Sequence, residues 1–277
     1  MKPVDFKHDN AGEIKAAAES IATSDGDVKF ISGGQSLGPM LNLRLARPTG
    51  VIGVTKIPQL KEVTQKRDFI QFGAAICHAD FEDGKLPEPI PGMMRKVASG
   101  IAYRAVRNRG TIGGSLCHAD PAADWMTAIT ALDAMLVAFS RSSGERIIPI
   151  TKFMHGAYRT ELRQDEILTA IKVPVYSSNA VWGYYKICRK VGEFADAIAS
   201  WVADPKKQYS RVVFGSTSGA PFVSEKLSAS IASKGEIPTE AEIFEALTDC
   251  PGAENPVKRQ LFSVALQRCI KQVFAHE

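Results

Sequence analysis

Two glycine-rich segments are the residues of this sequence best suited to chemistry. They are residues 32–36 (Ser-Gly-Gly-Gln-Ser) and residues 111–115 (Thr-Ile-Gly-Gly-Ser), and polar side chains flank the glycines in both. Glycine has no Cβ, so backbone N–H groups beside it can approach the oxygens of a phosphate or diphosphate. Each segment alone is equally compatible with a simple tight turn. Together they predict the two sides of one phosphate-binding site.

Standard glycine motifs do not account for these segments. Neither contains the lysine of Gly-x-x-x-x-Gly-Lys-Ser/Thr, and the glycines at 33, 34 and 38 do not have the Gly-x-Gly-x-x-Gly spacing, which excludes a P-loop and a Rossmann fingerprint. Residues 34–38 do match Gly-x-Ser-x-Gly, with Ser36 as the nucleophile of a serine hydrolase. That fold needs several strands and an oxyanion loop before the serine, and only 35 residues precede Ser36. A hydrolase is therefore disfavoured.

A second pattern is the repeat Cys-His-Ala-Asp at residues 77–80 and 117–120, which invites a metal site. Adjacent residues point to opposite faces of a strand, or about 100° apart on a helix, so each Cys-His pair would be a poor chelator. We expect no metal site in this chain. The five cysteines include no Cys-x-x-Cys pair and fit the reduced thiols of a cytoplasmic protein.

Composition limits the class of protein. The chain has 277 residues, 45% hydrophobic and 23% charged, which is typical of one large or two medium globular domains. The net charge of +4 is small and dispersed, so nucleic acid is not an expected partner. No apolar run approaches the ~20 residues of a membrane helix, and the first residues lack a signal-peptide core. We expect no membrane span and a cytoplasmic location.

The periodicity of apolar residues predicts the elements that position the two segments. Helices are predicted over residues 10–23 with a capping box at Asn10, over 37–45, over 93–101, and from Asp120 as N-cap to Leu136. After a break at 176–179, strands and two helices follow, one opening with a capping box at Thr239 and one at Pro256. Strands are predicted over 28–31, 51–54, 69–72, 137–139, 146–150, 167–174, 181–187, 197–202 and 212–215.

Three ordered motifs resemble a known family. They are FISGGQSLGPM (30–40), RAVRNRGTIGGSL (104–116) and HADPAAD (118–124), and the likeness continues through residues 165–168, 173–174, 185–186 and 189–190. The sequence resembles the FAD-binding medium subunit of molybdenum hydroxylases, the carbon monoxide dehydrogenase and xanthine dehydrogenase family. Arg104, Arg107 and Arg109 lie within the second motif, where they could balance phosphate charge, face a partner or form a solvated surface.

The resemblance implies an α+β protein with the FAD-binding fold of the vanillyl-alcohol oxidase type. FAD would lie between two α/β subdomains, about 1–56 and 57–176, which together form the FAD-binding domain, residues 1–176. A C-terminal domain of antiparallel sheet and helices, residues 177–277, would follow. This plan agrees with the elements that the periodicity predicts.

The resemblance also implies site residues. The two glycine segments would hold the diphosphate and ribityl chain, and Asp124 would accept from a hydroxyl, while Asp120 would help or would only cap its helix. Ile101 and Leu168 would pack near the isoalloxazine, and the charge of Lys186 would stabilise the reduced anionic flavin. No catalytic acid–base pair is visible in this chain. The implied FAD-binding residues are Ser32, Gly33, Gly34, Gln35, Ser36, Leu37, Ile101, Thr111, Ile112, Gly113, Gly114, Ser115, Asp120, Asp124, Leu168 and Lys186.

The implied function is electron transfer. In this family a large subunit hydroxylates the substrate at a molybdopterin cofactor, and electrons pass through two 2Fe-2S clusters of a small subunit to FAD and then to an external acceptor. The resemblance thus implies both partner subunits, assembled as a dimer of heterotrimers. Five scattered cysteines cannot ligate two clusters that need four thiolates each. Two alternatives remain, a free-standing flavin oxidoreductase of the same fold and a non-catalytic assembly or maturation protein.

Overall fold

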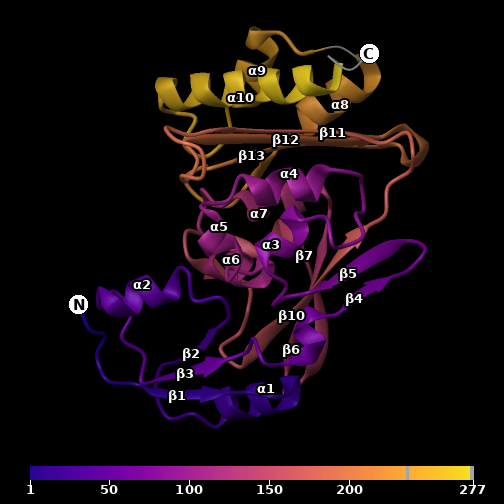
Figure 1. The fold of residues 1–277 in the computed structure, drawn as a ribbon. Helices are drawn as coiled ribbons and strands as arrows, with labels where there is room; N and C mark the ends of the chain where they lie inside the picture. The colour runs from indigo at the N-terminus through magenta and orange to yellow at the C-terminus, as the bar shows by residue number, and fades with distance from the viewer. Residues whose placement is uncertain (235–236, 275–277) are drawn as a thin grey trace.

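The structure, a computed structural model, describes residues 1–234 and 237–274. Figure 1 shows these residues in three stacked regions, with the N-terminal region at the bottom and the C-terminal helices at the top. Each region has its own sheet. Among the described residues, no helix is both long and apolar enough to cross a membrane.

The N-terminal region is a small parallel sheet with two helices. Its strands are ordered β1 (Lys7–Asn10), β3 (Gly50–Gly53) and β2 (Val28–Ile31), and its helices are α1 (Ile14–Ala22) and α2 (Leu37–Asn42). β1 is fully exposed and contains no apolar residue, which is why no hydrophobic pattern predicts it. The predicted capping box is wrong, because Asn10 ends β1 and Glu13 precedes α1 without a side-chain cap. The helix predicted to reach Leu45 ends at Asn42.

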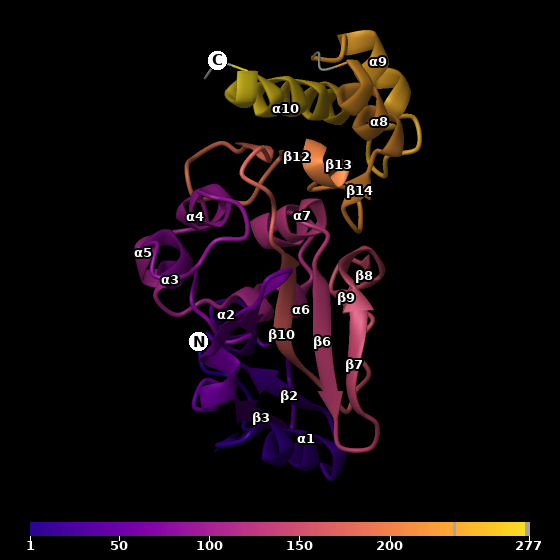
Figure 2. The ribbon, with the colours of Figure 1, turned by 90° about the vertical axis from the view of Figure 1, so that its right-hand side faces the viewer.

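The central region is a five-stranded antiparallel sheet with helices beside it. The strands are ordered β4 (Val63–Gln65), β5 (Phe69–Gly73), β10 (Glu166–Pro174), β6 (Met135–Ser140) and β7 (Gly144–Pro149). Figure 2 shows α3, α4 and α5 to one side of β10, β6 and β7, with α7 above the ends of these strands. The helices are α3 (His78–Glu82), α4 (Met93–Ser99), α5 (Arg104–Arg107), α6 (Ile112–His118) and α7 (Asp124–Ala131). The main core lies between sheet and helices and includes Phe72, Met93 and Trp125, all fully buried.

Smaller elements complete the central region. The 3-10 helices η1 (Pro58–Lys61) and η2 (Ile150–Lys152) and the hairpin of β8 (Met154–Gly156) and β9 (Arg159–Thr160) connect its larger elements. Two sequence expectations fail at α7. Asp120 does not cap it, because its Oδ1 accepts from the N–H of Ala122 at 2.9 Å in a turn and Ala123 is the N-cap. Leu136 belongs to β6, because Asp133, with a φ of 48°, has already ended the helical path.

The C-terminal region is a four-stranded antiparallel sheet covered on both faces. Its strands are β11 (Val181–Ile187), β12 (Ala197–Asp204), β13 (Tyr209–Gly215) and β14 (Phe222–Val223), in that order, with η3 (Pro205–Lys207) between β12 and β13. Three helices, α8 (Glu225–Lys234), α9 (Glu240–Ala246) and α10 (Pro256–Phe274), cover the outer face, and α4 and α7 pack on the other (Figure 1). Every residue of β12 is therefore buried.

Local signals in this region are mostly confirmed. β11 has the predicted bounds, and the capping box of Thr239 and Glu242 is present at the start of α9. The expectation of two closing helices is wrong, because α8 is a third. Its serine-rich sequence, EKLSASIASK, is a weak helix signal without tertiary packing.

Candidate functional site

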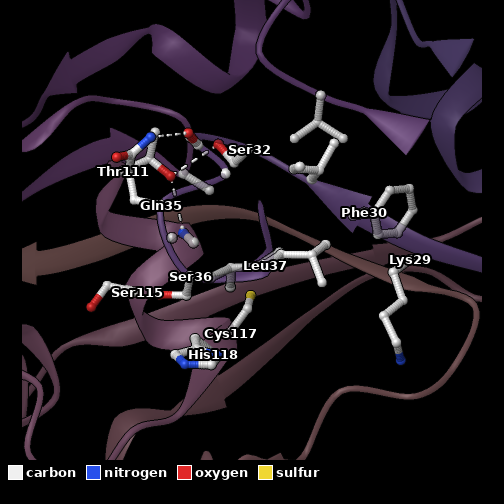
Figure 3. A pocket seen from close by; sticks show the side chains of 18 of the residues that line it. Lys29, Phe30, Ser32, Gln35, Ser36, Leu37, Thr111, Ser115, Cys117 and His118 are labelled. Carbon is white, nitrogen blue, oxygen red and sulfur yellow. Dashed lines mark hydrogen bonds between the residues drawn. The ribbon is translucent and has the colours of Figure 1, made fainter. Parts of the chain in front are cut away.

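A cavity of about 1130 Å³ is lined by residues from all three regions. This volume is slightly above the roughly 300–1,000 Å³ usual for ligand sites, so there is room for a dinucleotide-sized molecule. Figure 3 shows polar side chains of the two glycine segments along its wall, together with the apolar side chains of Phe30 and Leu37. The C-terminal region contributes Gly192, Glu193 and Phe194, which lie between β11 and β12.

The first glycine segment is a turn between β2 and α2, and residues 32–37 all line the cavity (Figure 3). Gly34 has a φ of +70°, a conformation that favours glycine. Within the described chain, the backbone N–H groups from Gly33 to Leu37 donate to no acceptor. The Gln35 Nε2 donates to the Gly33 carbonyl at 3.0 Å, which braces the turn. A row of unpartnered N–H groups on a cavity-lining turn fits the oxygens of a diphosphate.

The second glycine segment is the beginning of α6, not a turn. Thr111 is its N-cap, and the N–H of Gly114 donates to the Thr111 Oγ1 at 3.2 Å. The next N–H groups also have acceptors, since Ile112 donates to the Ile76 carbonyl, Gly113 to the Ala74 carbonyl and Ser115 to the Thr111 carbonyl. Gly113 allows this approach, because a Cβ there would lie 2.6 Å from the Ala74 carbonyl oxygen. The segment therefore offers side chains and close-packed backbone to the cavity, and its four N–H groups from Ile112 to Ser115 are already taken by protein acceptors.

The structure brings the two glycine segments into contact. The Thr111 hydroxyl donates to the Ser32 hydroxyl at 2.9 Å (Figure 3). A Cβ on Gly33 would lie 2.0 Å from the carbonyl oxygen of Arg109, so only glycine permits this packing. Thr111, Gly113, Gly114 and Ser115 line the cavity; the fully buried Ile112 side chain lies in the hydrophobic core and is not part of the lining.

Asp124 and Lys186 form a buried ion pair with each other. The Lys186 Nζ lies 2.9 Å from Oδ1 and 3.1 Å from Oδ2 of Asp124, and it also donates to the Gly100 carbonyl at 2.7 Å. The Tyr184 hydroxyl donates to Asp124 Oδ1 at 2.6 Å. Burial raises the pKa of the Asp124 carboxyl, and Lys186 and Tyr184 offset part of that rise. Asp124 lines the cavity and Lys186 does not, so the lysine meets the cavity through its partner.

The other predicted residues lie on the cavity wall. Ile101 and Leu168 line it, and Leu168 precedes a bulge in the pairing of β10 with β6. Asp120 also lines it. Such bulges are common beside functional sites.

His78 lines the cavity but is not among the predicted binding residues. It is 5% exposed, and its Nδ1 accepts from the Trp125 Nε1–H at 3.0 Å. Burial, with the nearby charge of Arg107, lowers the pKa of His78 to about 4, so the ring is neutral and its proton is on Nε2. The Cys-His-Ala-Asp repeat was the sequence signal for this residue. In the part of the chain that the structure describes, no three His, Cys, Asp or Glu residues form a group able to hold a metal.

The size of this glycine-lined cavity and its backbone donors, which are free among the described residues, suit a class of proteins that bind a dinucleotide cofactor. The chain belongs to the family described as the FAD binding domain in molybdopterin dehydrogenase, whose model matches residues 5–176.

Individual relatives support this assignment. The chain is similar to the caffeine dehydrogenase subunit beta of Pseudomonas sp. (strain CBB1), with 32% identity over 80% of this chain and 76% of that protein. It is also similar to the nicotine 6-hydroxylase medium subunit of Paenarthrobacter nicotinovorans, with 33% identity over 79% and 77%. Among solved structures, a chain of the carbon monoxide dehydrogenase from Hydrogenophaga pseudoflava matches with a TM-score of 0.90, 26% identity and 99% coverage of both chains.

Proposed function

We propose that this chain is the FAD-carrying electron-transfer subunit of a heteromeric molybdenum hydroxylase. One observation carries the proposal. The turn of residues 32–36 and the first residue of α2, Leu37, present five consecutive N–H groups that have no acceptor among the described residues. They lie on a cavity of about 1130 Å³, in a chain whose family is defined by FAD binding. When bound, FAD would supply the redox chemistry, and the protein would supply binding, orientation and charge.

The proposed roles of the residues follow from their surroundings. The backbone of residues 33–37 would bind the diphosphate, while Ser32 and Ser115 would add hydroxyl groups along the same wall and Thr111 would orient the Ser32 hydroxyl. Asp120 and Asp124 would accept from ribityl or ribose hydroxyls, since carboxylates accept and do not donate when ionised. Ile112 would act only by anchoring α6 in the core.

The ring end of FAD would lie near Ile101 and Leu168, the apolar residues proposed to pack against it. Lys186 would place its charge close to this end through Asp124, with which it shares a buried ion pair. While Asp124 is ionised the pair is neutral, so Lys186 would act by the orientation of this dipole and not by a net charge. The fold would be of the vanillyl-alcohol oxidase type, with subdomains of about 1–56 and 57–176 and a C-terminal domain of 177–277. The end of the family match at residue 176 supports the last boundary.

Partners follow from the relatives and from the cysteines. Relatives are named as a subunit beta and as medium subunits or chains, which favours a subunit over a free-standing oxidoreductase. The five cysteines are free thiols, too few for two 2Fe-2S clusters. We propose that a small subunit holds both clusters and a large subunit holds molybdopterin, in a dimer of heterotrimers. Free thiols also fit the reducing cytoplasm.

The test is purification with and without partners. The chain expressed alone should bind FAD and show the absorption spectrum of an oxidised flavin. A tagged copy isolated from its source should bring down two further chains, with molybdenum and iron in the same fractions. Flavin without any partner chain would favour the free-standing oxidoreductase. Partners without flavin would favour an assembly or maturation protein.

A further inference from the structure

The loop of residues 100–103, between α4 and α5, forms part of the cavity wall. Ile101 and Ala102 both line the cavity. Ala102 has a φ of 44°, in the left-handed region that residues with a side chain rarely adopt. Such a conformation persists only where neighbouring groups hold it.

Arg107 is the main contact of this loop. Its Nη1 donates to the carbonyl oxygens of Ile101 and Ala102, both at 2.9 Å. Its other edge makes a bidentate pair with Glu82 of α3, with Nε at 2.7 Å from Oε2 and Nη2 at 2.8 Å from Oε1. The Arg107 side chain is 11% exposed and Glu82 20%, so solvent competes little for these bonds. The planar guanidinium, with donors on two edges, is suited to join a carboxylate to two carbonyls, which a lysine cannot do.

Two further contacts hold the same loop. The Gly100 carbonyl accepts from the Lys186 Nζ at 2.7 Å. Gly192, with a φ of +92°, packs on Ala102, and a Cβ there would lie 2.5 Å from the Ala102 carbonyl oxygen. The loop is therefore fixed from β11 at Gly100 and from α5 at Ile101 and Ala102. Only Arg107 holds the two residues that line the cavity by hydrogen bonds from a side chain, within the described chain.

We propose that Arg107, oriented by Glu82, is a positioning residue that holds the Ile101 and Ala102 wall in the shape required for FAD. This inference rests on the proposed function. It gives one arginine of the second motif a role other than phosphate binding or partner contact. Arg107 acts through the loop, and its guanidinium makes four hydrogen bonds, two to Glu82 and two to the carbonyls.

Arg104 provides a matched control on the same helix. It also pairs with Glu82, with its Nη1 2.8 Å from Oε2, and it bonds Asp83, but it makes no bond to the loop. Arg104→Met and Arg107→Met each remove one guanidinium from this ion-pair cluster. Only Arg107→Met also removes the two bonds to the cavity wall.

The experiment measures FAD binding by fluorescence titration of the full-length apoprotein, and the ring environment by visible circular dichroism of the bound flavin. Arg107→Met should weaken FAD binding by about tenfold or more and change the visible spectrum, as losses of outer supporting contacts do. Arg104→Met should leave affinity and spectrum close to those of the wild type. Arg107→Lys should restore only part of the affinity, because a lysine cannot replace both edges of the guanidinium.

Glu82→Gln keeps the inference testable if Arg107→Met does not fold. It leaves Arg107 in place without its charged partner and should give a smaller change of the same kind. Wild-type affinity and spectrum in both Arg107→Met and Glu82→Gln would overturn the proposal, and so would equal losses in the Arg104 and Arg107 variants. Failure of the wild-type chain to bind FAD would instead contradict the proposed function.

Discussion

The two glycine segments resemble each other in sequence and differ in what their backbones can do. In the turn of residues 32–37, the N–H groups from Gly33 to Leu37 have no acceptor within the described chain. In residues 111–115, four consecutive N–H groups from Ile112 to Ser115 all donate to protein acceptors. Glycine content therefore does not reveal whether a segment can bind an anion. What decides is whether a neighbouring strand or cap has already taken the donors.

The difference comes from the neighbours of each segment. The stretch after β5 runs beside α6, and the Ala74 and Ile76 carbonyls accept from its first N–H groups. An isolated bridge between Cys77 and Thr111 fixes the same alignment. The first turn instead packs by Gly33 against the Arg109 carbonyl and Gly110, which leaves its own donors unused. The first glycine segment thus fits a role in binding, and the second fits a role in supporting the first.

The largest expected effect is a charge placed in the first turn. Ser36→Asp should weaken FAD binding by at least about 100-fold, because a carboxylate would face the diphosphate and juxtaposed like charges cost several kcal/mol. Folding stability should be unchanged, because an acidic residue is favourable at the start of α2. The control is Ser36→Asn, because asparagine has the shape of aspartate and no charge. Equal affinities of the two variants in a fluorescence titration would remove the first turn from the binding site.

Folding stability should depend on pH through His78, which lies beside the second glycine segment. His78 donates its backbone N–H to Gly110, next to the second segment, and its pKa falls from 6.5 to about 4 on folding. The unfolded chain protonates His78 more readily than the folded chain does. The contribution of the neutral His78 ring to the free energy of unfolding is therefore fully present above the unfolded pKa, and it is lost as pH falls from about 6.5 to about 4. The loss should reach roughly 3 kcal/mol, at 1.36 kcal/mol per pKa unit. Urea unfolding of the apoprotein across this range should show a shallower decline for His78→Gln; identical slopes would contradict the assignment.

Overpacking of the second segment should destabilise the fold without removing the site. In Gly113→Ala the new Cβ would lie 2.5 Å from the Ala74 Cβ, and the expected loss is about 1–3 kcal/mol in free energy of unfolding. The affinity of the folded fraction for FAD should change little. Gly38→Ala, where no atom lies within 4 Å of the new Cβ, is the control and should be neutral or stabilising. A large loss of affinity with normal stability would reverse the roles of the two segments.

The smallest expected effect is at the contact between the segments. Thr111→Ala removes the cap of α6 and the donor to Ser32, and should cost about 1 kcal/mol of stability in denaturant unfolding. Ser32→Ala removes only the acceptor and should cost less. If instead FAD affinity fell in Thr111→Ala while stability held, the Thr111 hydroxyl would be a direct ligand contact.

The sequence predicted elements whose signals are local. The strand at 28–31 and the strand at 181–187 have the expected bounds, because apolar residues there follow a strand pattern. It missed α6, because Ile-Gly-Gly-Ser has weak helix propensity and becomes helical only where Thr111 caps it and Ala74 permits close approach. Asp120 failed as a cap because α7 begins four residues later.

The site was predictable in part for the same reason. Residue types indicated that the two glycine segments belong together, and the structure brings them into contact. No local pattern could show that Lys186 pairs with Asp124, because the two are 62 residues apart and meet only when the C-terminal sheet packs on α4 and α7. The family itself came from motif resemblance, since periodicity indicated only an α+β chain.

The pair of Asp124 and Lys186 has a consequence for how the molecule unfolds. The carboxylate belongs to the central region and the ammonium to the C-terminal sheet, and both are buried. Separation of the two regions would break this ion pair together with the hydrogen bonds from Tyr184 to Asp124 and from Lys186 to the Gly100 carbonyl. Detachment of one region is thereby penalised relative to loss of both, so we expect the central and C-terminal regions to unfold in one cooperative transition although each has its own sheet.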